Sequence, residues 1–402
     1  MGILYTMRGL SVRCPVLTVW AMRRPRVWDR IRRIPRFFCE VSTIRVGIAN
    51  PRASYHNPSL QGQAYVERDS PLNFLMNPTD PILRMMPHAK PFVKWAGGKS
   101  KLIPQLKAAF PPQIYTDPSI TYIEPFVGGG AMLFHLLMDE HIHFKRIIIN
   151  DINADLMNCY RSIKDSPHDL LKELHRIEEL HWHMHSENGK SELFYAHRDR
   201  YNSGACTSEQ ERAALFLYLN HTCFNGLYRV NTEGAFNVPY GKRKKPIICN
   251  EERILADSEW LNSVDITMLT GDYAQVESYV DKGHTFMYID PPYKPLNSTS
   301  NFKEYSNSPF NDKEQEHLKE FCDRISAQGA TFMLSNSDAR DESGDSYFQR
   351  LYEGYHCHHV YAPRSINPQA QVRKHLPEIL ITNYPDHEQE DYDSSQQPRQ
   401  TD

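Results

Sequence analysis

The segment with the clearest chemical potential is 285–295, TFMYIDPPYKP, where an apolar run ends on an acid, two prolines and a tyrosine. The exocyclic amino group of a nucleic-acid base is a poor nucleophile, because its lone pair is delocalised into the ring. A carboxylate from Asp290 and a fixed backbone carbonyl could accept its two N–H bonds and stabilise the developing positive charge. Pro291 and Pro292 would fix that carbonyl, and Tyr293 offers a face for an everted base. The motif predicts amino-group methylation, although a strand that simply ends in a turn would also fit.

A glycine loop, EPFVGGG at 124–130, lies between a strand-like and a helix-like segment. Its glycines, among them Gly128, would let the backbone approach a ligand closely. Asp151 ends the next strand-like segment and could accept hydrogen bonds from ribose hydroxyls, unless it only caps the following helix. Because Glu124 would repel a pyrophosphate and attract a cation, the pattern favours S-adenosylmethionine over a dinucleotide.

Three further features of the sequence limit the possible reactions and cofactors. Asp272 ends a third strand-like segment and could accept a hydrogen bond from the adenine amino group of the cofactor, with Tyr273 beside the ring. WAGGKS at 95–100 resembles the end of a phosphate-binding loop, but that pattern requires glycine where Val93 stands, so a nucleoside triphosphatase is not expected. Methylation at cytosine C5 needs a nucleophilic cysteine, usually after a proline, and the chain has no Pro-Cys dipeptide.

The elements that must position these residues alternate between strand-like and helix-like, which predicts an α/β fold with a mostly parallel sheet covered on both faces. Ligands then bind beyond the carboxyl ends of the strands. Residues 166–264 interrupt this alternation of strands and helices. They are largely helical and charged and contain a hairpin pattern at 227–241 with Glu233-Gly234 at the turn, so we interpret them as an inserted domain. The expected strands are 120–126, 145–151, 265–272, 285–290, 330–336 and 378–384, and the expected helices include 131–140 and 312–328.

The two ends of the sequence differ from the middle. Residues 1–36 contain nine arginines and a single acid, Asp29. That composition is typical of an organelle transit peptide or of a translated upstream region. We favour the second interpretation, because organised sequence begins just after Met85 and Met86. The polar, acidic segment 386–402 is predicted to be a disordered tail.

The composition excludes several classes of protein. The 402 residues are 40% hydrophobic and 24% charged, with a formal net charge of −3 and no apolar stretch approaching 18 residues. We therefore expect no membrane span, and a nucleic acid would have to bind a local basic patch such as 241–246, GKRKKP. The eight cysteines form no C-x-x-C pair, which argues against a zinc knuckle and suits a reducing cytosol. No metal is expected at the histidine clusters 181–185 and 356–359 either.

Six segments together resemble the Dam family of DNA adenine-N6 methyltransferases, of the D12 class, over roughly residues 90–385. They are PFVKWAGGK, EPFVGGG, NDIN, FNGLYRVNTEGAFNVPYGKRKKP, YIDPPYKPLNSTSNFKEY and RSINPQAQVRK, in this order. DPPY alone is moderately specific, whereas the six segments in order are highly specific, and FNGLYR and PLNSTSNF point to the GATC class.

The resemblance implies a Rossmann-like, S-adenosylmethionine-dependent methyltransferase sheet with an inserted helical and β-hairpin DNA-recognition domain. The implied parts are an N-terminal extension over 1–90 that is disordered or wrongly assigned, a catalytic domain formed by 91–165 and 265–385, a target-recognition domain over 166–264, and the tail 386–402.

The resemblance also implies roles for single residues. Asp290 would be the catalytic carboxylate at the junction of cofactor and target base, and Tyr293 would stack on the flipped adenine. The expected cofactor-binding residues are Trp95, Lys99, Gly128, Asp151, Asp272 and Asp290.

On the DNA side, Arg229 resembles the family residue that reads a guanine by a bidentate contact, although it could instead pair with Glu233. Phe224 stands where the family commonly has tyrosine, so it keeps the wedging ring and loses the hydroxyl. The other expected contacts are Lys94 near the first base pair, Asn225 at the site of extrusion, Leu227 and Pro239 through apolar contact, Lys242 on the backbone, and a closing loop with Asn301, Phe302 and Tyr305.

The expected function is methyl transfer from S-adenosylmethionine to adenine N6 in double-stranded DNA at GATC. It would take place in the cytoplasm of a bacterial or phage-type system, with no obligatory protein partner. The alternatives are an N4-cytosine methyltransferase, an RNA N6-adenine methyltransferase, and an inactive DNA-binding regulator.

Overall fold

The computed structural model describes residues 6–7, 10–11, 87–294, 310–340, 344–362 and 376–385. By its internal contacts the chain forms two units, Met1–Pro71 and Leu72–Asp402. Within the first unit the described residues form two short antiparallel strands, β1 (Thr6–Met7) and β2 (Leu10–Ser11). All other described elements belong to the second unit. Most of the N-terminal extension and the whole acidic tail lie outside the described residues.

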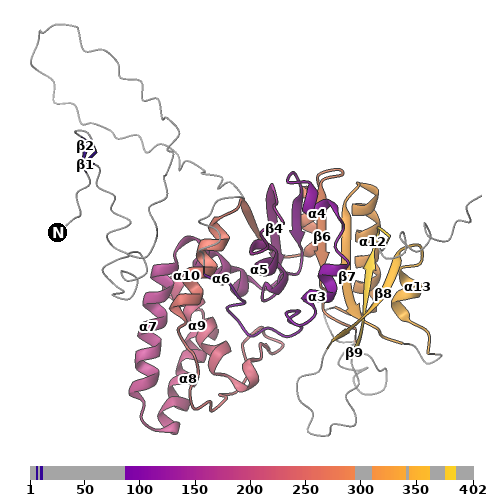
Figure 1. Cartoon of the computed structure of the whole chain (residues 1–402). Coiled ribbons are helices and arrows are strands. Elements are labelled where there is room, and N and C mark those ends of the chain that lie inside the picture. Colours follow the sequence, from indigo (N-terminus) through magenta and orange to yellow (C-terminus); the bar gives the residue numbers. More distant parts are fainter. Residues whose placement is uncertain are drawn as a thin grey trace, which may run out of the picture. The chain divides into compact units, whose positions relative to one another are not determined.

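The second unit is built on a seven-stranded sheet with the strand order β5-β4-β3-β6-β7-β9-β8 (Figure 1). The first five strands run parallel, and β9 and β8 are antiparallel to their neighbours. Because β4 and β5 lie on one side of β3 while β6 and β7 lie on the other, the topological switch point is between β3 and β6. The strands are β3 (Thr121–Glu124), β4 (Arg146–Asp151), β5 (Ile266–Thr270), β6 (Thr285–Ile289), β7 (Thr331–Ser337), β8 (His356–Ala362) and β9 (Leu376–Thr382).

Both faces of this sheet are covered. In β6, Phe286 and Tyr288 belong to one buried cluster, whereas Met287 and Ile289 belong to another. Strands buried on both faces read as continuous apolar runs, which is why they were recognisable in the sequence. The first cluster includes α3 (Ile103–Ala108), α4 (Gln113–Thr116), α5 (Ala131–Leu137) and α6 (Ala154–Asp165), and the second includes α12 (Asp312–Ala327) and α13 (Tyr347–Leu351).

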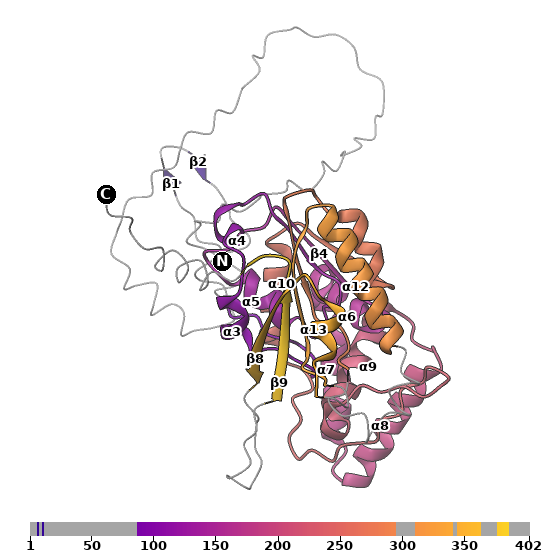
Figure 2. The same ribbon diagram turned by 90° about the vertical axis from the view of Figure 1, so that its right-hand side faces the viewer.

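Four helices gather beside the sheet, away from α12 and α13 (Figures 1 and 2). They are α7 (Pro167–His183), α8 (Glu187–Asn202), α9 (Glu209–Thr222) and α10 (Glu251–Asn262). Ser186, Ser208 and Asn250 begin α8, α9 and α10 by accepting a hydrogen bond from a first-turn amide, as helix caps do. Among the described helices, none is long and apolar enough to cross a bilayer.

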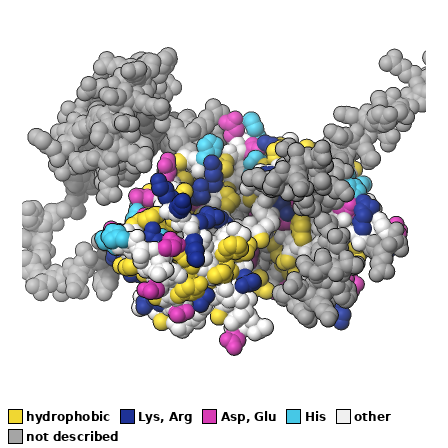
Figure 3. Space-filling model, turned by 90° about the horizontal axis from the view of Figure 1, so that it is seen from below, with side chains coloured by type: hydrophobic (Ala, Val, Ile, Leu, Met, Phe, Trp, Pro, Cys, Tyr) yellow, Lys and Arg dark blue, Asp and Glu magenta, His cyan; other side chains and the backbone are white. Residues whose placement is uncertain are grey.

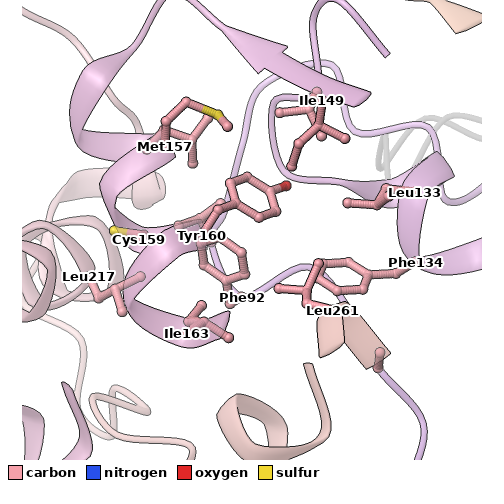
Figure 4. Close-up of a cluster of buried hydrophobic side chains, with 14 of the residues drawn as sticks. Phe92, Leu133, Phe134, Ile149, Met157, Cys159, Tyr160, Ile163, Leu217 and Leu261 are labelled. Carbon is pink, nitrogen blue, oxygen red and sulfur yellow. The ribbon is translucent and has the colours of Figure 1, made fainter. Parts of the chain in front are cut away.

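The helical segment and the sheet share one core. Figure 4 places Leu217 of α9 in the same cluster as Tyr160 of α6 and Ile149 of β4. The Phe92 ring meets Tyr160 edge-on, with 4.8 Å between the ring centroids. The division into a catalytic and a recognition domain at 166–264 therefore remains a prediction, because the packing continues across it.

The expected strands and long helices all occur, with ends that differ by a few residues. The helices α3, α4 and α13 and the strand β8 were not predicted from the sequence, and β8 contains the histidine cluster 356–359. The predicted hairpin over 227–241 is a tight turn closed by isolated antiparallel bridges, Val230 with Phe236 and Cys223 with Tyr240. Gly234 has φ +80° at this turn, a conformation that favours glycine.

The folded part begins before the expected boundary at residue 91. The Trp260 indole donates to the Pro87 carbonyl at 2.9 Å, and the Lys90 amide donates to Asp257 Oδ1 at 3.0 Å. Ala89 between them is fully buried. The partners lie 173 and 167 positions further along the chain, so no local signal in the sequence could have marked this segment as folded.

Candidate active site and DNA-facing surface

Three acids close the carboxyl ends of neighbouring strands at the switch point. Glu124 ends β3, Asp151 ends β4, and Asp290 directly follows β6. Because β3 pairs with both β4 and β6, these three ends are adjacent. Ligands of open parallel sheets bind at this edge, so the structure brings together acids that the sequence could only place one by one.

Asp290 is held through one of its two oxygens. Lys99 Nζ lies 3.2 Å from Oδ1, and Ser335 Oγ donates to the same oxygen at 3.0 Å. Among the described residues, Oδ2 has no hydrogen-bond partner, and the side chain is 20% exposed. Burial raises the pKa of Asp290 to about 6, while Lys99 and Ser335 oppose the rise. At neutral pH the carboxylate is therefore mostly ionised, with a free oxygen that can accept a hydrogen bond.

The buried ammonium of Lys99 is shared among three oxygen atoms. Besides Asp290, it lies 3.4 Å from Glu378 Oε2 and donates to the Tyr293 hydroxyl. That hydroxyl in turn donates to Glu378 Oε2 at 2.7 Å. Lys99 Nζ also lies 3.9 Å from the centroid of the Tyr293 ring. In the structure Lys99 thus contacts the DPPY motif, and its expected cofactor contact remains a prediction.

The backbone of the motif is fixed by α12 and the end of β7. Gln315 Nε2 donates to the Pro292 carbonyl at 3.2 Å, and Asn336 Nδ2 donates to Gln315 Oε1 at 3.3 Å. Asn336 Oδ1 accepts from the Lys294 amide at 3.3 Å. Gln315 and Asn336 are both fully buried. Gln315 binds the Pro292 carbonyl, whereas the Pro291 carbonyl accepts no hydrogen bond among the described residues, which makes it the better candidate acceptor for a base amino group.

The glycine loop is anchored to Asp151. Its Oδ2 accepts from the Gly128 amide at 3.0 Å and its Oδ1 from the Asn153 amide at 2.9 Å. The cap of α6 is Asn153 itself, so Asp151 is not the helix cap considered as an alternative. Gly128 has φ +48°, and a Cβ there would lie 2.9 Å from Trp95 Cδ1. The loop needs glycine both for its conformation and for the close approach of Trp95.

Glu124 behaves differently from what the sequence suggested. It is 2% exposed, and the Tyr122 hydroxyl donates to its Oε2 at 2.9 Å. Burial raises the pKa of Glu124 well above its usual range, and the nearby Asp290 raises it further. This carboxyl favours its neutral form, so the attraction for a cation falls to Asp151 and Asp290 instead.

Asp272 lies at the third strand end, but one oxygen is used locally. It is exposed, and its Oδ1 accepts from the Ala274 amide at 2.7 Å to cap a short 3-10 helix, Tyr273–Tyr279. The Tyr273 ring packs against Phe126, with 5.1 Å between centroids. A contact between Asp272 and the cofactor adenine therefore remains a prediction that rests on its second oxygen.

Trp95 connects the glycine loop to the recognition segment. Its ring stacks on Tyr228, with 5.3 Å between centroids and 26° between planes. Tyr228 stands between Leu227 and Arg229 in the sequence. One indole therefore contacts the loop expected to hold the cofactor and the segment expected to read DNA.

The expected DNA-contacting residues form an exposed surface. Phe224 is 51% exposed and Leu227 is 45% exposed, and exposed apolar side chains that lie together on a surface often mark a binding site. Asn225 has φ +55°, and Pro239 is also exposed. Figure 3 shows hydrophobic side chains mixed with Lys and Arg on the face seen from below. Such a mixture suits contact with bases as well as phosphates.

Arg229 is oriented by a neighbour across the turn. Its Nε donates to Asn237 Oδ1 at 2.8 Å, so it does not use Glu233, the acid considered above. Among the described residues, its two terminal nitrogens have no hydrogen-bond partner. Arg229 is exposed, and its fork is therefore free to bind a base edge.

A basic segment borders this surface. Residues 242–245, KRKK, are all exposed. Lys94 is tied through its backbone to Asn220, with both hydrogen bonds at 2.9 Å, and burial beside Arg243 lowers its pKa. A pocket of about 210 Å³ opens here, lined among others by Lys94, Arg243, Lys245 and Arg253. Among its lining residues there is no acid, so the pocket suits an anion.

Histidines of the two histidine-rich segments contact other side chains of the protein. His181 is buried with its Nδ1 3.2 Å from the Tyr218 hydroxyl, and His359 lies 3.4 Å from Asp338. A further group brings His175, Glu178 and Cys249 together. The Cys249 amide donates to Glu178 at 3.3 Å, and the half-exposed His175 also lies 3.4 Å from Glu251. Hydrogen bonds and ion pairs account for this group, so it does not by itself require a metal.

Several residues of the site were not predicted from the sequence. Glu378, Ser335 and Gln315 contact the DPPY motif from β9, β7 and α12. No spacing rule links them to residue 290, because the contacts depend on strand order. The residues expected in the closing loop, Asn301, Phe302 and Tyr305, lie outside the described residues.

Comparison with known proteins decides the family. The model of the D12 class N6 adenine-specific DNA methyltransferases matches residues 95–366. A type II methyltransferase of Methanocaldococcus jannaschii is 43% identical over 297 residues, 73% of this chain and 99% of the relative. This chain belongs to the D12 class of N6 adenine-specific DNA methyltransferases.

Other relatives agree. A type II methyltransferase of Lactococcus lactis subsp. cremoris is 36% identical, over 73% of this chain and 95% of the relative. A DNA adenine methylase of Salmonella typhi is 30% identical, over the same shares. As a member of this class the protein is an adenine-specific DNA methyltransferase with DNA as its substrate.

Proposed function

We propose that the protein transfers a methyl group from S-adenosylmethionine to N6 of adenine in double-stranded DNA, at GATC sites. The observation that carries the proposal is Asp290. Its Oδ2 has no hydrogen-bond partner within the described part of the chain and lies beside two rigid prolines, at the switch point of the sheet. The exposed aromatic and basic recognition surface lies on the same folded unit.

The residues of the glycine loop fit S-adenosylmethionine. Asp151 uses one lone pair of each oxygen for backbone amides, so each oxygen can still accept from a ribose hydroxyl. The close approach of Trp95 to Gly128 leaves no room for a side chain there, and the loop backbone can face the ligand. Asp151 and Asp290 favour a cationic ligand. The bound cofactor would supply an electrophilic methyl group on its positively charged sulfur.

The protein's own groups would activate the amino nitrogen. Asp290 Oδ2 would accept one N–H of the adenine amino group and the Pro291 carbonyl would accept the other, so N6 becomes tetrahedral and its lone pair is no longer delocalised into the ring. With the cofactor bound, N6 would receive its methyl group as the methyl–sulfur bond breaks, and Asp290 Oδ2 would accept the proton that N6 then releases. The positive charge on nitrogen is stabilised by these acceptors, because they are fixed before the reaction.

Tyr293 would hold the extruded base. Its hydroxyl is fixed between Lys99 and Glu378, so its ring cannot rotate freely. Stacking on a fixed ring contributes about 1–3 kcal/mol per base. That offsets much of the few kcal/mol needed to flip the base out of the duplex.

The choice of sequence would rest on the recognition segment. Arg229 is held by Asn237, and its terminal nitrogens have no partner in the described segments, which suits a bidentate contact to guanine. Phe224 and Leu227 would contact bases, and the 242–245 segment would neutralise phosphates. GATC itself is proposed from the resemblance of the FNGLYR and PLNSTSNF segments to enzymes of that class.

The test uses plasmid DNA from a host without adenine methylation. The full-length protein and S-adenosylmethionine are incubated with it, and the product is digested with nucleases that distinguish methylated from unmethylated GATC. We expect protection from the enzyme that methylation blocks. Modification at adenine outside GATC, read by modification-sensitive sequencing, would leave the adenine chemistry standing and refute the GATC assignment.

The same product separates the alternatives. Mass spectrometry of nucleosides distinguishes N6-methyladenine from N4-methylcytosine, and parallel reactions with duplex DNA and RNA define the substrate. An inactive regulator would bind DNA without consuming the cofactor. This function would place the protein on DNA in the cytoplasm, with no obligatory protein partner.

A further inference from the structure

Glu378 joins the two parts of the DPPY motif from a distant strand. It lies on β9, opposite Ser337 of β7, and its side chain is 13% exposed. Its Oε2 accepts from the Tyr293 hydroxyl at 2.7 Å and lies 3.4 Å from Lys99 Nζ. Lys99 Nζ in turn lies 3.2 Å from Asp290 Oδ1. One buried ammonium therefore serves two carboxylates, and the three groups together carry a net charge of −1 when both acids are ionised.

This sharing changes what Asp290 can do. A carboxylate paired with an ammonium of its own is a weaker base and a weaker hydrogen-bond acceptor. Because Lys99 is also drawn toward Glu378 and Tyr293, it neutralises Asp290 only in part. Both contacts of Asp290 also go to Oδ1, which leaves the charge of Oδ2 available to a base.

We propose that Glu378 is a positioning residue that divides the charge of Lys99 between two acids, keeps Asp290 basic, and fixes the hydroxyl of Tyr293. The inference rests on the proposed function for the role of Asp290 and Tyr293. It adds Glu378 as the residue that sets the basicity of Asp290 and the position of the Tyr293 hydroxyl. The contacts of Glu378 go to Lys99 and to the Tyr293 hydroxyl, so it acts on Asp290 and the base through these two residues.

The predicted consequence is a shift in pH dependence. In Glu378→Gln the neutral amide no longer competes for the ammonium, so Lys99 pairs with Asp290 alone. The negative charge that helps to raise the pKa of Asp290 is also lost. Both changes favour the ionised form, so the pKa of Asp290 falls. The acid limb of kcat/KM then moves to lower pH by about one unit, and kcat on the plateau falls about tenfold with the weaker acceptor.

A second readout needs neither cofactor nor DNA. The carboxyl stretch of protonated Asp290 can be followed by difference infrared spectroscopy against pH, and is identified by its absence in Asp290→Asn. In the wild type we expect its midpoint near pH 6. In Glu378→Gln the midpoint moves lower, in parallel with the kinetic limb.

Three variants make the test specific. Glu378→Asp keeps the charge and should leave both midpoints close to wild type, with a smaller loss of kcat. Tyr293→Phe removes the hydroxyl but leaves both carboxylates around Lys99, so its midpoint should stay near 6. Glu320→Gln removes an equivalent charge from the exposed face of α12 and should change nothing.

The outcomes separate the two proposals. If the wild type methylates adenine but Glu378→Gln leaves the infrared midpoint unmoved or raises it, the role of Glu378 is refuted alone. If the midpoint falls but no variant, including the wild type, methylates adenine, the charge sharing stands and the proposed function is refuted. If Glu378→Gln does not fold, Glu378→Asp decides: a charge-retaining variant whose midpoint nonetheless falls contradicts the mechanism.

Discussion

At the scale of single residues, Asp290 carries a stability cost together with its chemistry. Its pKa is raised to about 6 from a reference value of 3.8, so the native state holds the proton more tightly than the unfolded chain. The contribution of Asp290 to the free energy of unfolding is then largest below pH 4 and falls as pH rises through 6, by up to about 3 kcal/mol. Residues with this signature occur where function requires a charge that folding disfavours.

Asp290→Asn should therefore separate activity from stability. We expect turnover to fall by at least about 10²–10³-fold, because a preorganised acceptor is lost, with DNA binding retained. At pH 7 the variant should be more stable than the wild type, and its unfolding free energy should not fall between pH 4 and 6. Urea unfolding at several pH values measures this. An Asn variant that is active, or that keeps the wild-type pH dependence of stability, would contradict the assignment.

The proposed role of Arg229 in sequence choice belongs to the same scale. Its Nε is bound by Asn237, while Pro239 and Leu227 are exposed nearby. Arg229→Ala should relax discrimination at one base pair by about 1–3 kcal/mol, as expected for a lost bidentate contact. Competition binding with duplexes that differ at each position of the site measures this loss. Lys242→Ala is the matched control and should weaken all duplexes alike. Equal weakening by both variants would place Arg229 on the phosphates.

At the scale of elements, the helices α7 to α9 enclose two histidines in neutral form. His181 and His197 pack edge-on against Tyr218, and the Nε2 of each is buried without a partner in the described structure. Burial lowers the pKa of each to about 4 from 6.5. As the pH falls, the unfolded chain takes up a proton at each histidine before the folded protein does. The stability that depends on these two neutral histidines is therefore complete above pH 6.5 and is lost as pH falls toward 4.

His181→Phe should reduce the loss of unfolding free energy at acidic pH. A shift of this size corresponds to at most about 3 kcal/mol for each histidine. We therefore expect the unfolding free energy of the variant to fall less than that of the wild type between pH 7 and 5, as followed by urea denaturation. His185→Phe, on an exposed position just after α7, should leave the pH dependence unchanged. The same slope in both variants would show that His181 is not the group that titrates.

The elements also define what the sequence could reveal. β3 and β6 were predictable because burial on both faces makes them apolar throughout, and the glycine loop because its backbone excludes side chains. β8 was missed because HCHH lies on an edge strand of mixed polarity, where composition carries little strand signal. Glu378 could not be assigned to the site, since only the antiparallel insertion of β9 beside β7 brings it to Tyr293.

At the scale of the whole molecule, the charges are unevenly distributed. The formal net charge is −3, yet residues 242–245 are four exposed cations in a row, and the pocket beside them has no acid in its lining. A protein with this pattern approaches DNA through one face and is repelled elsewhere. Its affinity for DNA should therefore depend on a few local phosphate contacts rather than on overall attraction.

The salt dependence of DNA binding measures how many phosphate contacts the protein makes. For duplex DNA the logarithm of the binding constant should fall linearly with the logarithm of the salt concentration, with a slope of about −0.9 for each phosphate neutralised. Replacing Lys244 with Ala should make the slope shallower by about one unit if that side chain meets a phosphate. Lys313→Ala, on the exposed start of α12, is the control and should keep the wild-type slope. A slope near zero in the wild type, or an equal change in both variants, would mean that the 242–245 segment does not face the DNA, and the duplex would have to lie along another surface of the protein.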